Sequence, residues 1–239
     1  MELRDFIENE LQLYAGKVIR TYNSFIPLFD YLYHNPKPDE SSRLLMRAYH
    51  YKAQLLGWYS RSTDALINSL HGIVGKASTT GFPLEDIKAY IRSGRKSDVD
   101  LQPTHLGQSR LSILLNLLYV EKVGKAPFNV KYKGIEPHID HIYPQSPLRK
   151  QLGLASAEIN DIGNFRFIGA SDNLRKRAEL PASFFGRLKT GGIDIEKHLL
   201  LPDVSADPSK LVFDGPTYAS FRSRRHDEIW KIVNRVVNP

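Results

Sequence analysis

Residues 137–144 read PHIDHIYP and, with Asn164 and Asn173 farther along, carry most of the chemical information in this chain. The stretch sets an acidic residue beside a histidine, and two asparagines and a basic segment follow. Carboxylate and amide oxygens suit a hard cation, imidazole accepts a proton near neutral pH, and cationic side chains bind phosphate. These residue types in this order predict a site that cuts phosphodiester bonds with one metal ion.

Each residue of the predicted site has its own expected task. Asp140 and Asn173 are predicted to hold the cation, because Mg²⁺ keeps several waters and needs few protein oxygens. His141 is predicted to be the general base, since the ordinary pKa of imidazole lies near neutrality. Asn164 is expected to hydrogen-bond the loop that carries His141. His138 shares a strand face with Asp140, and its role stays open between a substrate or metal contact and a structural one.

The spacing adds one geometric condition and two candidate phosphate ligands. Neighbours on a regular strand point to opposite faces, so Asp140 and His141 converge only if the chain bends between them. Asn173 is expected in the first turn of a helix, with Lys176 and Arg177 at i+3 and i+4 on the same side. A phosphate at Asn173 would then lie near two cations and a helix N-terminus.

The charge distribution favours a polyanionic partner such as DNA. The chain has 33 Lys and Arg against 26 Asp and Glu. Residues 1–122 hold 15 against 13, and residues 123–239 hold 18 against 13, so the excess lies in the part with the motif. Arg149 and Lys150 follow the predicted site loop and are further candidate phosphate contacts. The alternative is a solvated basic surface without a partner.

The composition excludes several classes of site. The chain has no cysteine, which excludes disulfides, thiolate zinc sites and a cysteine nucleophile. Its first residues lack the apolar core of a signal peptide, and no apolar run is long enough for a bilayer, so we expect a cytoplasmic protein without a membrane partner. The sequence opens inside an amphipathic pattern, which favours a piece of a longer protein.

Residues 1–122 show the apolar periodicity of helices. Apolar residues recur at helical spacing over residues 7–18 and 25–32. The segment NPKPD at residues 35–39 interrupts the pattern, and Ser41 or Ser42 is expected to cap the next helix. Further elements expected in this region are helices over residues 64–74, from residue 83 and over residues 111–120, and a polar loop over residues 92–103.

Short strands and loops are predicted after residue 122. The strand candidates are residues 128–132, part of 135–142, and 164–168. Gly163 would permit a turn with positive φ. A helix is expected from Ser171, with Leu174 and Ala178 packing inward. The last expected elements are a loop-rich stretch after residue 181 and a helix over residues 217–237.

The expected fold class is therefore α+β and mostly α-helical. Its parts are a helical region over residues 1–122, a small strand–strand–helix unit over residues 123–190, and a loop with a C-terminal helix over residues 191–239 that packs on this unit.

The motif residues resemble a known family. The segments HIDHIYP at 138–144, IGNF at 162–165 and NLRK at 173–176 resemble the His-Asn-His (HNH, ββα-metal) nucleases. The resemblance is specifically to the nuclease domain of GmrSD-like and SspE-like restriction and phage-defence proteins. The final histidine of the family name is asparagine here, at Asn173, a variant that suits a hard cation. The resemblance is specific over about residues 123–190 and looser before them.

The resemblance implies a DNA endonuclease of a restriction or anti-phage system with one divalent cation, Mg²⁺ or Mn²⁺. It implies that Asp140 and Asn173 hold the metal, His141 activates water, and Asn164 braces the loop. It also implies products with 5′-phosphate and 3′-hydroxyl ends. The parent proteins carry an N-terminal NTPase-like domain, so this chain, which has no Gly-rich phosphate loop, would be the C-terminal effector part.

Three alternatives stay open at this stage. Asp140 and His141 could form a buried ion pair that closes a strand. The chain could be a catalytically silent nucleic-acid-binding module that keeps the fold, or a helical regulatory domain that responds to a partner. The basic run at Arg222, Arg224 and Arg225 could face solvent or DNA.

Overall fold

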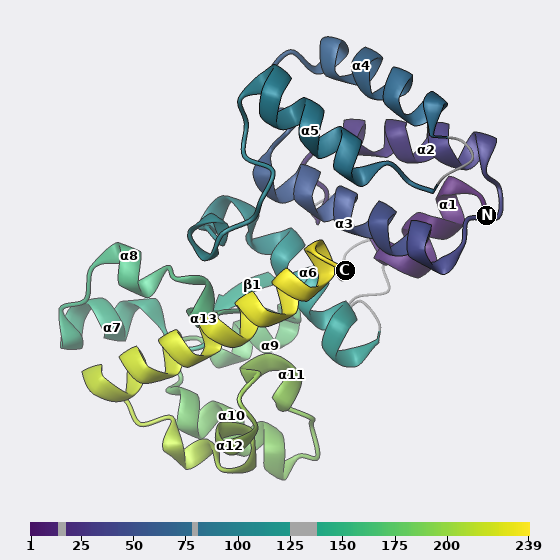
Figure 1. Ribbon diagram of the computed structural model, residues 1–239. Coiled ribbons are helices and arrows are strands. Elements are labelled where there is room, and N and C mark those ends of the chain that lie inside the picture. Colours follow the sequence, from purple (N-terminus) through teal and green to yellow (C-terminus); the bar gives the residue numbers. More distant parts are fainter. Residues whose placement is uncertain (14–17, 78–80, 125–137) are drawn as a thin grey trace. The chain divides into compact units, whose positions relative to one another are not determined.

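The computed structural model describes residues 1–13, 18–77, 81–124 and 138–239 (Figure 1). They divide into two compact units, residues 1–105 with 233–239, and residues 106–232. Helices predominate, and the strands found in the described ranges form one two-stranded antiparallel sheet, which confirms the mostly α-helical α+β class. The strand predicted over residues 128–132 lies outside the described residues. None of the helices in the described ranges is both long and apolar enough to cross a bilayer.

The first unit is helical. Its elements are α1 (Leu3–Asp5), the π-helix η1 (Phe6–Leu11), η3 (Tyr22–Ser24), α2 (Phe25–His34), α3 (Glu40–Leu56), α4 (Thr63–Lys76), α5 (Leu84–Arg95) and η4 (Pro103–His105).

Aromatic side chains fill the centre of this unit. The ring of Phe82 lies 5.3 Å from that of Tyr31 and 5.4 Å from that of Tyr49, between centroids. The helix α3 begins after Asp39, whose carboxylate accepts a hydrogen bond from the amide of Ser42 at 2.7 Å. The prediction that Ser41 or Ser42 caps this helix was wrong, because the aspartate one turn earlier supplies the capping oxygen.

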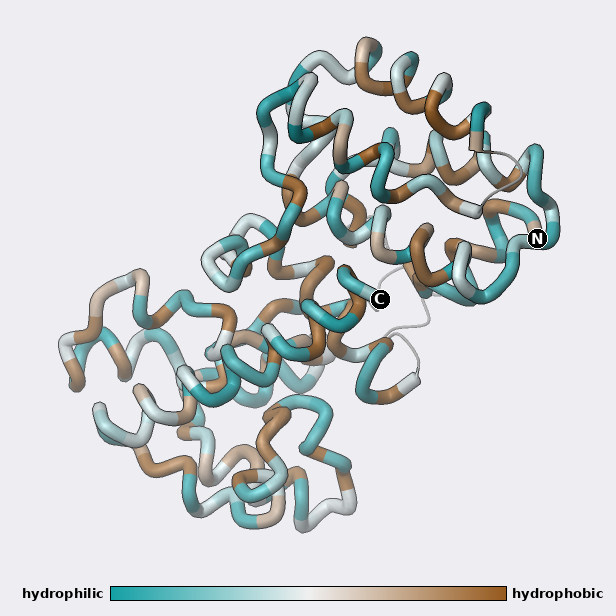
Figure 2. The backbone as a smooth tube through the Cα atoms, in the orientation of Figure 1, coloured by the Kyte–Doolittle hydropathy of each residue, from teal (hydrophilic) through white to brown (hydrophobic). Residues whose placement is uncertain are grey.

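The second unit combines the sheet with short helices. Its elements are η5 (Gln108–Arg110), α6 (Leu111–Val123), β1 (His138–His141), α7 (Gln145–Leu152), α8 (Ser156–Ile159), η6 (Ile162–Asn164), β2 (Phe165–Ile168), α9 (Ala170–Lys176), α10 (Pro181–Thr190), α11 (Glu196–Leu199), α12 (Pro202–Ala206), η7 (Pro208–Lys210) and α13 (Gly215–Val237), whose last residues belong to the first unit. Figure 2 shows hydrophobic and hydrophilic segments alternating along the helices of both units, as expected of amphipathic helices.

The core of the second unit gathers residues from distant parts of the sequence. Tyr143, just after β1, packs against Tyr218 and Phe221 of α13, with ring centroids 5.1 and 5.3 Å away. The helix α6 belongs to this unit, since Tyr119 contacts Phe167 and hydrogen-bonds His198. The boundary between compact units therefore falls after residue 105, earlier than the expected boundary after residue 122.

Two local predictions after β2 were wrong. The helix α9 ends at Lys176, and Leu174 is 77% exposed instead of packed inward. Ala178 lies beyond the helix and is exposed as well. The stretch after residue 181 is not loop-rich, because α10, α11 and α12 occupy much of it. The helices predicted over residues 64–74, 111–120 and 217–237 are present as α4, α6 and α13.

Gly163 is required for a reason that the sequence did not indicate. Its φ is not positive, so the predicted left-handed turn is absent. Instead, the backbone of α13 approaches so closely that a Cβ at this position would overlap the carbonyl oxygen of Arg222. This close approach lets α13 pack directly on the turn that precedes β2.

We predict that Gly163→Ala lowers the free energy of unfolding by about 2 kcal/mol or more, because overpacking against a rigid backbone forces a shift of α13. The matched control is Gly186→Ala, since a Cβ at that position in α10 meets nothing within 4 Å. Alanine should be neutral or stabilising there. Urea denaturation measures both, and equal stability of the two variants would contradict the packing argument.

Candidate active site on the two-stranded sheet

The register of the sheet decides which candidate residues share a face. The strands pair Asp140 with Arg166 and His141 with Phe165. Cross-strand partners project to the same face, and neighbours along a strand project to opposite faces. Asp140 therefore lies on one face with His138, and His141 lies on the other face. The chain does not bend to bring the side chains of Asp140 and His141 together.

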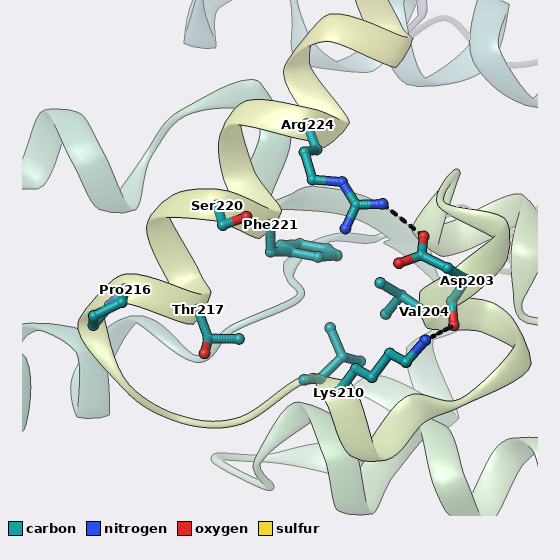
Figure 3. A pocket seen from close by; sticks show the side chains of 9 residues that line it. Asp203, Val204, Lys210, Pro216, Thr217, Ser220, Phe221 and Arg224 are labelled. Atoms are coloured by element: carbon teal, nitrogen blue, oxygen red, sulfur yellow. Dashed lines mark hydrogen bonds and ion pairs between the residues drawn. The ribbon is translucent and has the colours of Figure 1, made fainter.

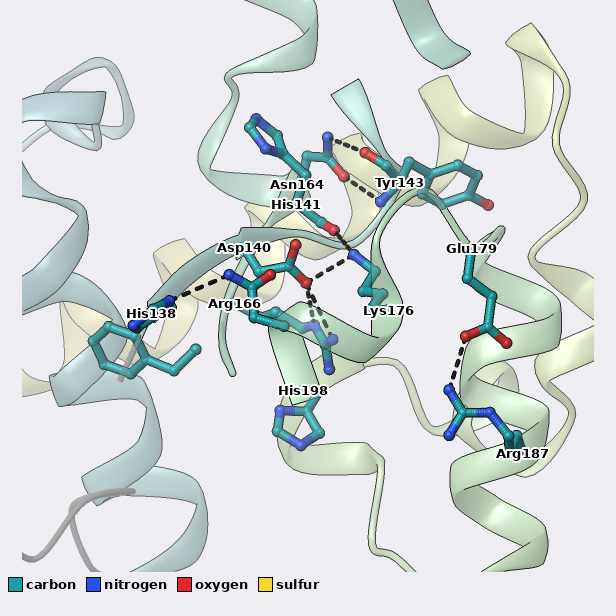
Figure 4. A network of polar contacts seen from close by, with 12 residues as sticks. His138, Asp140, His141, Tyr143, Asn164, Arg166, Lys176, Glu179, Arg187 and His198 are labelled. Carbon is teal, nitrogen blue, oxygen red and sulfur yellow. Dashed lines mark hydrogen bonds and ion pairs between the residues drawn. The ribbon is translucent and has the colours of Figure 1, made fainter. Parts of the chain in front are cut away.

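Asp140 is the centre of a buried ion cluster (Figure 4). Its Oδ2 accepts hydrogen bonds from Lys176 Nζ at 2.7 Å and from Nε and Nη2 of Arg166 at 3.1 Å each. The side chains of Arg166 and Lys176 are only 1% exposed, and that of Asp140 is 12% exposed. Burial lowers the pKa of Lys176 to about 8, an effect that Asp140 partly offsets. The negative charge of Asp140 thus offsets part of the desolvation free energy of the two buried cations.

This cluster changes the role of Lys176. The sequence predicts that its ammonium group binds DNA phosphate, but this group is buried and also donates to the backbone oxygen of His141. An ammonium in this position is unavailable to a ligand outside. The other predicted phosphate contacts differ from it: Arg177 at the end of α9 and Arg149 and Lys150 in α7 are all exposed.

The face of Asp140 also holds the second predicted metal ligand. Asn173 Nδ2 lies 3.3 Å from His138 Nδ1, which brings α9 to the start of β1. No hydrogen bond from the described part of the chain occupies Oδ1 of Asp140 or Oδ1 of Asn173. Two protein oxygens with waters suit Mg²⁺ or Mn²⁺, so the donor types fit one hard cation. The described residues contain no group of three or more carboxylates and histidines that could hold a metal more tightly.

His141 is held in a defined orientation on the opposite face. Its Nε2 lies 2.9 Å from Oδ1 of Asn160, and its ring lies 4.4 Å from that of Phe165. An amide oxygen accepts the N–H of Nε2, which leaves the lone pair of a neutral imidazole on Nδ1. Burial lowers the pKa of His141, partly offset by Asn160 and Asp140. His141 is therefore a neutral, oriented imidazole, as a general base requires.

Asn160 was not recognised in the sequence. It lies at the C-terminal end of α8, and no motif marks it. Only the folded chain shows that it reaches a histidine nineteen residues earlier.

Asn164 fastens the loop that follows His141. Its side chain is fully buried; Oδ1 accepts from the amide of Tyr143 at 2.8 Å, and Nδ2 donates to the carbonyls of Tyr143 and Ile159 at 3.2 and 3.0 Å. These bonds match the expected hydrogen bonding of that loop. Because Ile159 precedes Asn160, one side chain ties the loop after the histidine to the helix end that orients it.

Arg225 supports the same turn from α13. Its side chain is fully buried and donates from Nη1 to the carbonyls of Ile162 and Gly163 at 3.1 and 3.0 Å. The sequence allows Arg225 to face either solvent or DNA, and the buried side chain faces neither. The signal was available in the sequence, since Arg225 falls on the apolar stripe between Tyr218 and Ile229.

The sequence matches no protein-family model and no curated protein. The assignment of a function therefore depends on the chemistry and geometry of these residues, and the resemblance to HNH nucleases stays a prediction.

We predict that Lys176→Met increases the affinity for Mn²⁺ at least about tenfold. Two unit charges about 4 Å apart interact by about 4 kcal/mol at an effective dielectric constant of about 20, so the ammonium beside Asp140 opposes a divalent ion. Arg166 still pairs with the carboxylate in this variant. Titration of the full chain followed by electron paramagnetic resonance of free Mn²⁺ measures the change.

Arg175→Met is the matched control, because Arg175 lies on the same helix but is exposed. Asp140→Asn should abolish the binding. If Lys176→Met and Arg175→Met bind Mn²⁺ equally, or if Asp140→Asn retains it, the ion is not held at Asp140.

Proposed function

We propose that this chain is a metal-dependent DNA endonuclease in which His141 activates the attacking water. The observation that carries the proposal is the orientation of a neutral His141 by Asn160 at the last position of β1. Asp140 and Asn173 lie on the other face of the sheet, so the proposal requires the phosphate to lie at the end of β1, where it can reach both faces. The order β1, β2, α9 agrees with the strand–strand–helix unit expected from the resemblance.

The residues would divide the reaction as follows. His141 Nδ1 takes a proton from water while Asn160 holds the ring. The water oxygen attacks phosphorus, the bond from phosphorus to O3′ breaks, and the leaving oxygen takes a proton from solvent water, which gives 5′-phosphate and 3′-hydroxyl ends. Asp140 and Asn173 would hold one Mg²⁺ or Mn²⁺, which when bound supplies charge stabilisation for the phosphate and the leaving oxygen.

Exposed cations would position the DNA. Arg149 and Lys150 lie at the end of α7, and Arg177 lies at the end of α9. Such contacts bind phosphate without reading sequence. A role in restriction or anti-phage defence, and a parent protein with an NTPase-like domain, belong to the same proposal and depend on the resemblance.

One observation favours a second candidate, a nucleic-acid-binding module without catalysis. Oδ2 of Asp140 is engaged by Arg166 and Lys176, and His141 lies on the opposite face. In this alternative, the ion cluster is structural and the exposed cations alone bind DNA.

Cleavage of supercoiled plasmid tests the proposal. With Mg²⁺ or Mn²⁺ we expect nicked or linear product, no product with EDTA, and a rate about 10²-fold or more lower for His141→Ala, because a general base contributes roughly that much. His226→Ala is the matched control, a histidine of α13 outside the site. Plasmid left uncut by the wild type under every metal condition, but retained in a salt-sensitive manner, would favour the binding module.

A separate variant tests the positioning role of Asn160. Asn160→Ala should lower kcat by about tenfold with little change in KM, since the base loses its orientation but DNA contacts remain. Asn160→Asp keeps an acceptor oxygen for Nε2 and should restore most of the rate. If alanine and aspartate behave alike, the hydrogen bond to His141 does not position the base.

A further inference from the structure

The first unit contains a cleft of about 540 Å³ that the proposed nuclease site does not use. It is lined by the connection between α3 and α4, the first turn of α4, and the end of α5 with the residues that follow. A volume of this size lies within the range of about 300–1,000 Å³ found for small-molecule pockets.

The charged groups of this cleft are all cationic. Arg61, Arg95 and Lys96 line it, and no aspartate or glutamate occurs among its described lining residues. The hydroxyls of Ser60 and Ser62 add hydrogen-bond donors. Arg61 and Lys96 are exposed, and neither forms an ion pair within the described ranges, so their charges are available to a ligand.

Arg95 makes the cationic wall rigid. Its guanidinium donates to the backbone carbonyls of Arg61 and Ser62, the latter at 3.2 Å. These bonds hold the α3–α4 connection against the end of α5 without cancelling the charge, because both acceptors are neutral. An anion in the cleft would therefore meet a positive charge that is already in place.

The N-terminus of α4 adds to the positive electrostatic potential of the cleft. Ser62, the N-cap residue, has φ 44° and ψ 55° and its side chain caps no amide of the fourteen-residue helix. Ser62 and Ala65 both line the cleft. The amides of this first turn thus favour an anion at the same place as the three cationic side chains.

A cleft in the second unit shows the contrast (Figure 3). It has a volume of about 340 Å³ and is lined by Arg224 and Lys210, but Asp203 lies between them. Arg224 Nη2 is 2.6 Å from a carboxylate oxygen of Asp203, and Lys210 donates to the backbone oxygen of the same residue at 3.4 Å. That cleft has an internal counter-charge, whereas no carboxylate is among the described residues that line the cleft of the first unit.

We propose that the cleft of the first unit binds a ligand through its phosphate groups, either a nucleoside phosphate or the backbone of a nucleic acid. Guanidinium groups and helix N-terminal amides both match phosphate oxygens, and charge-assisted bonds of this kind are the strong ones. The site uses none of the residues proposed for cleavage.

Isothermal titration calorimetry of the full chain tests this inference with pyrophosphate, ATP and a short DNA duplex. EDTA in the buffer prevents cleavage of the duplex. The variant is Arg61→Gln with Lys96→Asn; asparagine is chosen because Lys96 has φ 50°, which asparagine tolerates. Arg95 is left intact because it holds the connection. Lys76→Gln, an exposed lysine at the other end of α4, is the matched control.

We expect the double variant to weaken phosphate binding about tenfold or more, with the loss diminishing at high salt, while Lys76→Gln binds as the wild type does. If the double variant loses affinity for pyrophosphate and ATP, the site binds free phosphate compounds. If it loses affinity for the duplex alone, the site binds nucleic acid. Equal affinity of wild type and double variant for all three probes, or no binding of any probe at low salt, overturns the inference. The single variants repeat the test if the double variant has an altered circular dichroism spectrum.

Discussion

The second unit depends on the pairing of its buried cations, because burying a charge without a partner costs several kcal/mol. Arg166 and Lys176 are tolerated through Asp140, and the rings of Phe184 and Phe185 lie 4.5 and 4.9 Å from the guanidinium carbon of Arg166. The strand β1, the strand β2 and the helix α9 each contribute one member of this cluster. Its formation fixes the register of the sheet and the position of the helix at once.

Two buried polar side chains, Asn164 and Arg225, hold the loops around the sheet through their backbone groups. Asn164 satisfies three backbone groups at Tyr143 and Ile159, and Arg225 satisfies carbonyls at Ile162 and Gly163. A buried carbonyl or amide without a hydrogen bond destabilises the fold by more than a typical hydrogen bond stabilises it. Each of these side chains therefore prevents a loss of stability in the loop that it contacts. The orientation of His141 then follows from the loop, because the helix end that carries Asn160 is part of the same hydrogen-bonded assembly.

Periodicity predicted the elements that are long or strongly patterned, such as α4, α6 and α13, and the strand around Phe165. The bracing of a loop by Asn164 was also accessible, because Asn164 belongs to one of the segments that carry the resemblance, although its partner Tyr143 lies 21 residues away. Lys176, Asn160 and Gly163 were misjudged or missed because their partners lie far away in sequence and become neighbours only after folding. A lysine in a basic helical segment is expected at the surface, and only the fold shows that Asp140 of β1 pairs with Lys176 in the core. The helix α10 was missed because flanking glycines and prolines outweighed its apolar pattern.

In the proposed activity, the carboxylate of Asp140 has to compensate two buried cations and also bind a divalent metal ion. Oδ2 of Asp140 already receives three N–H bonds from two cations, and only Oδ1 remains for a metal. A divalent ion there would raise the local charge far above what one carboxylate compensates. The phosphate groups of DNA carry the charge that restores the balance, so metal and nucleic acid should bind cooperatively, each more tightly in the presence of the other. An enzyme built in this way would hold its metal weakly when alone and assemble the complete centre only on its substrate.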